Sequence, residues 1–171
     1  MIKLREIKAD DADYMLEWMH DPNIQKCFRK NMMKYTLDDV KLFCINSKIP
    51  EKISNGTDIH YAIANEKDEY LGTISLKNID TENKSAEYAV VMRRIAQGHG
   101  YAYAASSILL DKAFKELNLH RVYLNVLANN QNAIKLYEKL GFVFEGEFRE
   151  HIKKNDKFLN LKWYGLIDSK L

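Results

Sequence analysis

Proline, glycine and cysteine are all scarce in this chain of 171 residues, which contains two, seven and two of them respectively. So few prolines and glycines leave little material for a flexible linker, and the length suits one domain with a sizeable core. Cys27 and Cys44 lack the spacing of a metal site, so we expect both to be reduced packing residues. We therefore expect a single domain over residues 1–171 that needs no metal.

The sequence also lacks a strong excess of either charge and any long apolar run. Its 26 basic and 24 acidic residues give a formal net charge of +2, without the basic excess typical of nucleic-acid-binding proteins. The first fifteen residues, MIKLREIKADDADYM, are charged throughout and contain no apolar core of a signal peptide. We therefore expect a cytoplasmic protein that binds neither nucleic acid nor a membrane.

Alternating and helical patterns predict the order of the elements. Strands are predicted at residues 2–7, 59–65, 69–79, 85–93 and 120–128, and the chain ends in a hairpin that turns at residues 153–156. Helices are predicted at residues 9–20, 36–47, 101–117 and 130–141, with Asp21-Pro22 ending the first and a loop after the second. The order β-α-α-β-β-β-α-β-α-β-β predicts a mixed α/β sheet flanked by helices.

The segment RRIAQGHGYAYAA, residues 93–105, joins a predicted strand to a predicted helix through two glycines. Such a turn directs several backbone N–H groups, backed by the positive end of the helix, toward one point, where a phosphate is the natural ligand. Three nucleotide motifs do not fit. The P-loop lysine is absent, Tyr103 replaces the third glycine of a dinucleotide fingerprint, and a kinase loop lies between two strands. The pattern that remains is Gln97-x-x-Gly100-x-Ala102.

This pattern, placed after an extended strand, resembles the pyrophosphate-binding motif of the GCN5-related N-acetyltransferase (GNAT) superfamily. The later segment NNQNAIKLYEKLGFVFEGEFRE resembles a second motif of that family, with Asn130, Ala133, Leu136, Tyr137, Lys139, Gly141 and Phe142 in place. The resemblance is strongest over residues 87–148 and follows the element order of the whole chain. It implies a single-domain fold with a mixed, mostly antiparallel central sheet. It also implies acetyl transfer from acetyl-coenzyme A (acetyl-CoA) to a primary amine by direct attack on the thioester.

The resemblance assigns a set of cofactor-binding residues. In the family, amides of the glycine turn hold the pyrophosphate, the pantetheine arm lies along the preceding strand, and a helix-cap asparagine contacts the cofactor. Side chains in place of the two glycines would crowd the phosphate, and a tight turn without a ligand is the structural alternative. The residues implied are Val91, Met92 and Arg93 on the strand, Asn130 at the helix cap, and Gln97, Gly98, His99, Gly100, Tyr101 and Ala102 in the turn.

Two residues are candidates for catalysis. Tyr137 follows Asn130 by seven residues, so both side chains lie on one helix face, and it matches the family's general acid. A phenol of pKa ~10 can protonate a departing thiolate whose thiol has a pKa of ~8.5. Glu87 matches an acidic residue that in related enzymes takes a proton from the amine, directly or through water. A core aromatic at 137 and a surface carboxylate at 87 are the structural alternatives.

The acceptor is less well defined by the sequence. The pattern Trp18-x-x-Asp21-Pro22 and the final hairpin resemble the branch that holds ribosomal-protein N-terminal, polyamine and amino-sugar acetyltransferases. We expect a small amine or an amino sugar, because basic residues are at least as common as acidic ones in both regions. A protein N-terminus and a polyamine stay open, as does a homodimer. A non-catalytic acyl-CoA-binding domain is the alternative from another class.

Overall fold

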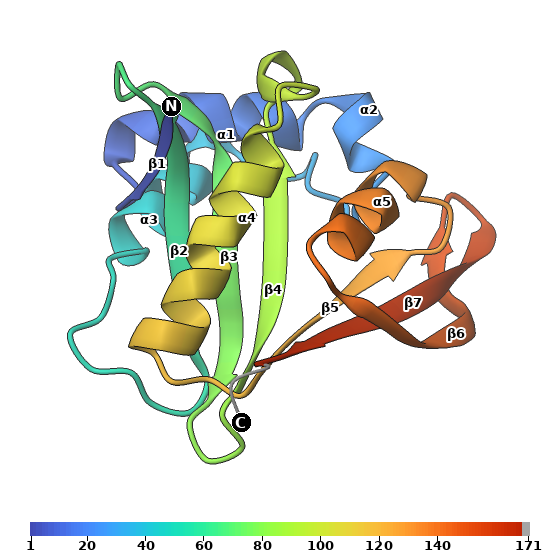
Figure 1. Ribbon diagram of the computed structural model, residues 1–171. Coiled ribbons are helices and arrows are strands. Elements are labelled where there is room, and N and C mark those ends of the chain that lie inside the picture. The colour runs from blue at the N-terminus through green and yellow to red at the C-terminus, as the bar shows by residue number, and fades with distance from the viewer. Residues whose placement is uncertain (169–171) are drawn as a thin grey trace.

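The computed structural model describes residues 1–168, which form one seven-stranded sheet with helices on both faces (Figure 1). The strands lie in the order β1-β2-β3-β4-β5-β7-β6, and only β4 and β5 are parallel neighbours. The strands are β1 (Ile2–Arg5), β2 (Thr57–Asn65), β3 (Tyr70–Asp80), β4 (Ser85–Met92), β5 (Arg121–Leu127), β6 (Val143–Lys154) and β7 (Lys157–Ile167). The mixed, mostly antiparallel sheet predicted from the sequence is confirmed.

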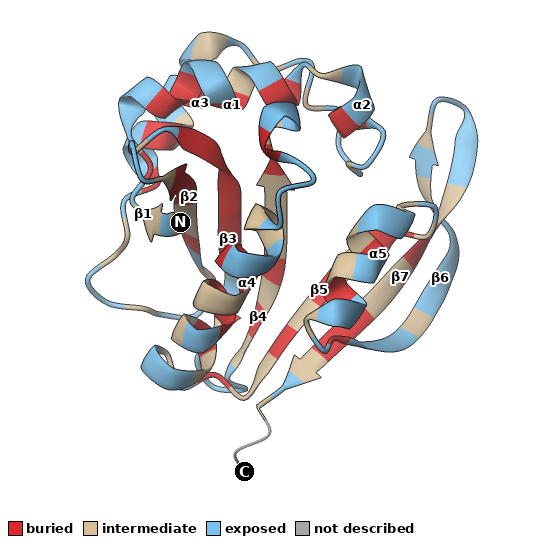
Figure 2. Ribbon diagram, turned by 45° about the horizontal axis from the view of Figure 1, so that its top comes forward, coloured by how far each residue is buried: buried red, intermediate tan, exposed pale blue. Residues whose placement is uncertain are grey.

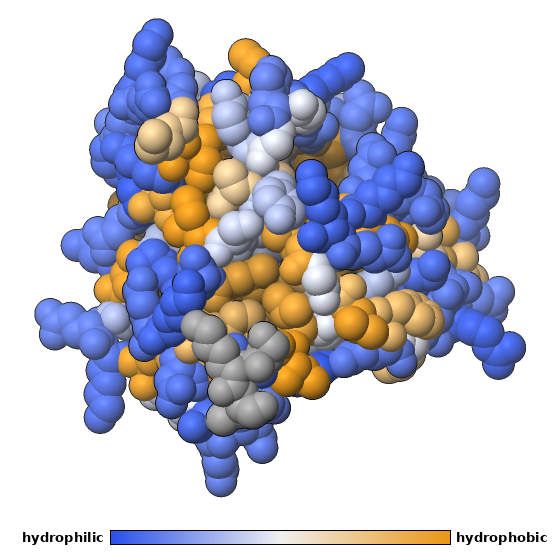
Figure 3. Space-filling view, in the orientation of Figure 1, coloured by the Kyte–Doolittle hydropathy of each residue, from blue (hydrophilic) through white to orange (hydrophobic). Residues whose placement is uncertain are grey.

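Helices cover the sheet on two sides (Figures 1 and 2). The helices are α1 (Ala12–Met19), α2 (Pro22–Gln25), α3 (Leu37–Asn46), α4 (Tyr101–Asp111) and α5 (Gln131–Lys139). Leu109 of α4 and Ile134 of α5 belong to one apolar core, whereas Met15 of α1 and Val40 of α3 belong to a second. On the face that α4 and α5 cover, apolar and weakly polar side chains gather toward the middle and hydrophilic ones surround them (Figure 3). None of the helices described is long and apolar enough to cross a membrane.

The ends of the helices follow from local chemistry. Thr36 caps α3, as expected, through a capping box in which Asp39 N–H donates to the Thr36 hydroxyl and the Asp39 carboxylate accepts from Thr36 N–H. Asp21-Pro22 ends α1, but it also begins α2, a short helix that the sequence analysis missed. Proline occupies the first turn of α2, and the Asp21 side chain accepts a hydrogen bond from Asn23 N–H.

Parallel pairing between β4 and β5 is confined to the beginning of both strands. Ser85, Ala86 and Glu87 face Arg121, Val122 and Tyr123, and no later residues of the two strands pair. Beyond this point β4 pairs with β3 as far as Met92, and β5 pairs with β7 as far as Leu127. Each half of the sheet therefore stays continuous while the two halves separate, and Figure 2 shows β4 and β5 diverging.

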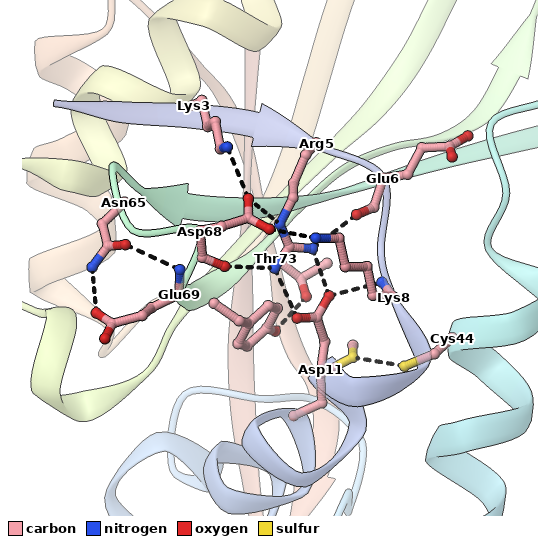
Figure 4. A network of polar contacts seen from close by, with 12 residues as sticks. Lys3, Arg5, Glu6, Lys8, Asp11, Cys44, Asn65, Asp68, Glu69 and Thr73 are labelled. Carbon is pink, nitrogen blue, oxygen red and sulfur yellow. Dashed lines mark hydrogen bonds and ion pairs between the residues drawn. The ribbon is translucent and has the colours of Figure 1, made fainter.

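A buried ion pair fixes the start of α1 against the sheet (Figure 4). The Arg5 guanidinium donates two hydrogen bonds to the Asp11 carboxylate at 2.7 and 2.8 Å, and Lys8 N–H donates a third at 2.8 Å. Asp68, in the β2–β3 turn, pairs with Lys3, Lys8 and Arg5, and the hydrogen bonds from Lys3 and Lys8 hold its pKa well below the ordinary value. These contacts join β1, the start of α1 and the β2–β3 turn.

We predict that Asp11→Asn destabilises the protein strongly. The Arg5 and Asp11 side chains are only 12% and 5% exposed, so the variant leaves a largely buried guanidinium with the more exposed Asp68 as its remaining counter-charge. Loss of one partner of a buried pair costs about 3 kcal/mol, which urea denaturation would measure as a lower free energy of unfolding. Asp10→Asn, at the exposed neighbouring position, should change this free energy by less than about 0.5 kcal/mol. Equal stability of the two variants would contradict the role given to the pair.

Candidate active site

A cleft with a volume of about 980 Å³ lies where β4 and β5 diverge. Its walls come from α2 and the segment after it, β4, the glycine turn, the start of α4, β5 and α5. The sequence-predicted residues that line it are Glu87, Val91, Met92, Gln97, Gly98, Gly100, Tyr101, Ala102, Asn130 and Tyr137. Two motifs that are separated in the sequence therefore meet at one cleft.

The glycine turn presents unpaired backbone N–H groups to this cleft. Gly98 and Gly100 have φ angles of +79° and +75°, and no protein atom lies within 4 Å of the place where a Cβ would stand. Gly100 is the N-cap of α4, whose first N–H groups have no partner within the helix. Arg94 and Lys139 add positive charge to the same wall. The turn is therefore built to receive an anion the size of a phosphate group.

The free edge of β4 supplies a second binding element. Arg93 N–H donates to Leu71 O at 2.8 Å, so the alternation of a strand directs the backbone groups of residues 91 and 93 toward β3. The backbone groups of Val90 and Met92 face the opposite way, into the cleft, where β5 no longer pairs with β4. An extended chain with amide groups can hydrogen-bond along this edge. The resemblance to the GNAT family implies that the pantetheine arm of CoA binds in this way.

Arg93 and His99 are the two predicted cofactor residues that do not line the cleft. The Arg93 guanidinium binds Glu17 of α1 and Tyr70 O, and it lies 4.4 Å from the centre of the Tyr14 ring. The His99 ring is exposed and stacks on Tyr101, in agreement with the expectation that it points to solvent. Neither side chain therefore lines the cleft.

Tyr137 is held at the cleft by α5 and by two aromatic rings. Its ring makes edge contacts with Tyr88 and Phe142 at centroid distances of 5.9 and 6.1 Å. The residue is 8% exposed, and burial, together with neighbouring Cys27, raises the pKa of its phenol well above the ordinary value. Asn130, two turns earlier, caps α5 by accepting from Ala133 N–H at 3.3 Å. Tyr137 thus presents a protonated hydroxyl to the cleft at neutral pH.

Glu87 is a largely buried carboxylate at the point where the strands part. Its side chain is 13% exposed, and Lys77 Nζ lies 3.2 Å from its Oε1. The side-chain amides of Asn78 and Asn125 donate to it at 3.2 and 3.3 Å, and the Arg29 guanidinium lies 3.7 Å away. Cations and amides thus surround this carboxylate.

Several residues of the cleft carried no signal in the sequence. Asn23 and Cys27 reach it from α2 and the turn after it, because the Lys154 ammonium of the distant hairpin binds the carbonyl oxygens of Gln25 and Phe28. Asn125 enters from β5. These contacts join segments far apart in the chain, so no local pattern reports them. The alternation of β5 does place Asn125 on the same face as Tyr123, which is paired with Glu87.

Comparison with known proteins agrees with this geometry. Residues 2–143 match the model of the acetyltransferase (GNAT) domain family, and the chain belongs to that family. It is 31% identical to the N-acetyltransferase p20 of Bacillus licheniformis over 97% of this chain and 92% of that protein. It is 30% identical to spermidine N(1)-acetyltransferase of Vibrio cholerae over 99% of this chain and 94% of that protein.

Solved structures give the same fold. The crystal structure of the Vibrio cholerae spermidine N-acetyltransferase in complex with CoA and spermine superposes with a TM-score of 0.87 and 25% identity, covering 99% of this chain and 96% of that chain. The protein is therefore an acetyl-CoA-dependent N-acetyltransferase, as expected from the two motifs. Its own residues fit that co-substrate, because the cleft combines an anion cradle with a free strand edge.

We predict that Gly98→Ala and Gly100→Ala weaken CoA binding. Each places a methyl group in the open space of the cleft, and a side chain at this φ strains the turn by about 1–2 kcal/mol. Loss of one or two hydrogen bonds to a charged phosphate should raise the dissociation constant for CoA at least about tenfold in calorimetric titration.

Gly56→Ala is the matched control for these variants. Gly56 has a φ of +81°, equally open surroundings and a position outside the cleft, in the turn before β2. It should show the same backbone strain with unchanged affinity for CoA. Wild-type affinity in the Gly98 and Gly100 variants would show that the turn does not hold the pyrophosphate.

Proposed function

We propose that the protein acetylates the primary amine of a small molecule, with Tyr137 as the general acid that protonates the CoA thiolate. In this reaction the amine nitrogen attacks the thioester carbonyl, a C–N bond forms and the C–S bond breaks. One proton leaves the nitrogen and one is delivered to the sulfur. The observation that carries the proposal is a protonated tyrosine at a cleft whose other walls suit CoA.

The burial of Tyr137 is compatible with this role. Desolvation raises the pKa of its phenol, and it acts in the same direction on a thiolate that forms beside it. The proton affinities of the two groups therefore rise together, and the phenol keeps its proton until the thiolate appears. Proton transfer at that moment removes a negative charge from a poorly solvated site.

Glu87 is proposed to receive the proton that the amine gives up, through a water molecule. It accepts hydrogen bonds from Lys77, Asn78 and Asn125, and it lies on β4 where the pairing with β5 ends. The cations beside it also disfavour an ammonium ion, which lowers the pKa of an amine bound there. A neutral, nucleophilic amine is the form that this environment supports.

The proposed acceptor is a small-molecule amine. The relatives that act on spermidine support this class, since the alignment covers nearly all of this chain. A ribosomal-protein N-terminus is the alternative that an assay with peptides would reveal. A non-catalytic acyl-CoA-binding domain would release no thiol from acetyl-CoA with any amine.

We predict that Tyr137→Phe lowers kcat for thiol release by about 10² to 10⁴-fold. The phenyl ring keeps its contacts with Tyr88 and Phe142, so calorimetric affinity for CoA should change by less than about twofold. Tyr61→Phe, on β2 and outside the cleft, should match the wild type in both measurements. An unchanged kcat in Tyr137→Phe would remove Tyr137 as the acid.

Glu87→Gln should lower kcat/KM for the amine by about 10²-fold, because the amide accepts no proton at neutral pH. The KM for acetyl-CoA should stay the same, since Glu87 lies beside the reacting amine. Glu82→Gln, in the exposed β3–β4 turn, is the control. If Glu87→Gln and Glu82→Gln have equal kcat/KM values for the amine, Glu87 is not the base.

A further inference from the structure

A second cavity, of about 340 Å³, lies on the opposite side of β4 from the α4 core. Helices α1 and α3 and the segment from Phe28 to Tyr35 enclose it above strands β2, β3 and β4. Phe28, Lys77 and residues 89–91 line both this cavity and the CoA cleft. The cavity therefore adjoins the cleft at the strand along which the pantetheine arm is expected.

The wall of this cavity is mainly apolar. Its apolar side chains are Met15, Trp18, Met19, Phe28, Met32, Tyr35, Val40 and Phe43. The Trp18 N–H donates to the Tyr70 hydroxyl, and the ring stacks on Phe28 at a centroid distance of 5.5 Å. Such a wall stabilises an apolar group by removing it from water, at roughly 25 cal/mol for each Å² buried.

The polar groups of the wall are engaged with one another or are cationic. The Asp39 carboxylate accepts from Thr36 within the cap of α3, and it is the one carboxylate of the wall. His60 shares a 2.7 Å hydrogen bond with Ser75, and burial lowers the pKa of its imidazole, which favours the neutral form. Lys30 has no acidic partner among residues 1–168, whereas Lys77 pairs with Glu87.

This composition disfavours a polycation. A second ammonium group on the acceptor would enter a mainly apolar space beside Lys30 and Lys77, and the carboxylate among the lining residues, Asp39, lies at the exposed cap of α3. Two of the acidic residues that could have formed such a site are paired with arginine elsewhere. Asp11 binds Arg5, and Glu145 binds Arg121.

The Glu87 carboxylate, beside which the amine is proposed to react, lies a short distance from the cavity. Glu87 and Ala89 point to the same face of β4 and are two residues apart, which is about 7 Å along a strand. An apolar cavity of about 150 Å³ holds one benzene molecule, so the larger volume found here accommodates an aromatic ring and its linker. A linker of two carbons can bridge an amine beside Glu87 and a ring above Ala89.

Resting on the proposed function, we infer that the acceptor is an arylalkyl monoamine, whose ring occupies this cavity while its amino group reaches the thioester beside Glu87. The spermidine-specific chemistry named for the relatives would then not extend to this chain.

The test compares three acceptors in an assay of thiol release from acetyl-CoA. 2-Phenylethylamine and ethylamine share the aminoethyl unit and differ only in the ring, and spermidine supplies the polycation. We expect kcat/KM for 2-phenylethylamine to exceed both other values by at least about tenfold. Equal values for 2-phenylethylamine and ethylamine, or faster turnover of spermidine, would overturn the inference.

Two variants separate the ring from the charge. Val40→Phe places a ring in the cavity and should bring the ratio between 2-phenylethylamine and ethylamine close to one, with an unchanged KM for acetyl-CoA. Lys30 is exposed, so Lys30→Glu should not disturb folding. This variant should raise kcat/KM for spermidine, and its kcat/KM for 2-phenylethylamine should change by less than about threefold. A Lys30→Glu protein that still rejects spermidine to the wild-type extent would contradict the electrostatic part of the inference.

A binding measurement keeps this inference distinct from the proposed function. Tyr137→Phe protein loaded with CoA should bind 2-phenylethylamine in calorimetric titration at least about tenfold more tightly than ethylamine. If no amine is turned over but this preference is observed, the proposed reaction fails and the cavity assignment stands. If amines are turned over without the preference, the cavity assignment alone fails.

Discussion

The limited pairing between β4 and β5 is the constraint on which the rest of the structure depends. Three pairs of residues hold the two strands together, and beyond Glu87 each strand keeps only its other neighbour. The separation leaves the backbone edge of Val90 and Met92 without a partner strand. It also opens the space into which the glycine turn and α5 direct their polar groups. If β5 continued to pair with β4, the backbone groups of Val90 and Met92 would be used in hydrogen bonds within the sheet.

In the proposed reaction, the cofactor and the acceptor bind on different sides of β4. Backbone groups at the edge of β4 and in the glycine turn suit CoA, because its phosphates require hydrogen-bond donors and its amides require both donors and acceptors. Side chains on the face toward α1 and α3 line the second cavity, and Glu87 projects from the same face of β4. The Arg5–Asp11 pair and the Arg93–Glu17 pair hold α1 in place above that face. In this proposal, acceptor selection depends on the packing of α1, and cofactor binding depends on the sheet.

Local patterns in the sequence predicted much of the fold. Alternation, capping and periodicity are properties of short segments. They correctly predicted the last strand, the cap at Thr36 and the start of the helix after the glycine turn. Most of the residues that line the cleft could be named from the sequence for the same reason, since the glycine turn and the Asn130–Tyr137 helix are contiguous motifs. Helix α2 was not predicted, because Asp21-Pro22 both ends one helix and begins the next, and proline is common in the first turn of a helix.

Non-local contacts could not be predicted in this way. Lys154 binds the end of α2 across more than a hundred residues, and Glu87 gathers partners from three further segments. The second cavity likewise combines side chains from helices and strands that no single pattern joins. The acceptor expectation stays a prediction, because it counted acidic and basic residues without knowing which were already paired. Arg5 and Arg121 each bind a carboxylate that the count had left free.

A crystal structure of the protein with bound CoA tests the central claim most directly. The account predicts the pyrophosphate on the amides of residues 98–102 and the pantetheine arm along the edge of Val90 and Met92. It predicts the CoA sulfur within hydrogen-bonding reach of the Tyr137 hydroxyl, at about 3–3.5 Å. A sulfur that lies away from Tyr137, or a cofactor bound outside the space between β4 and β5, would contradict it.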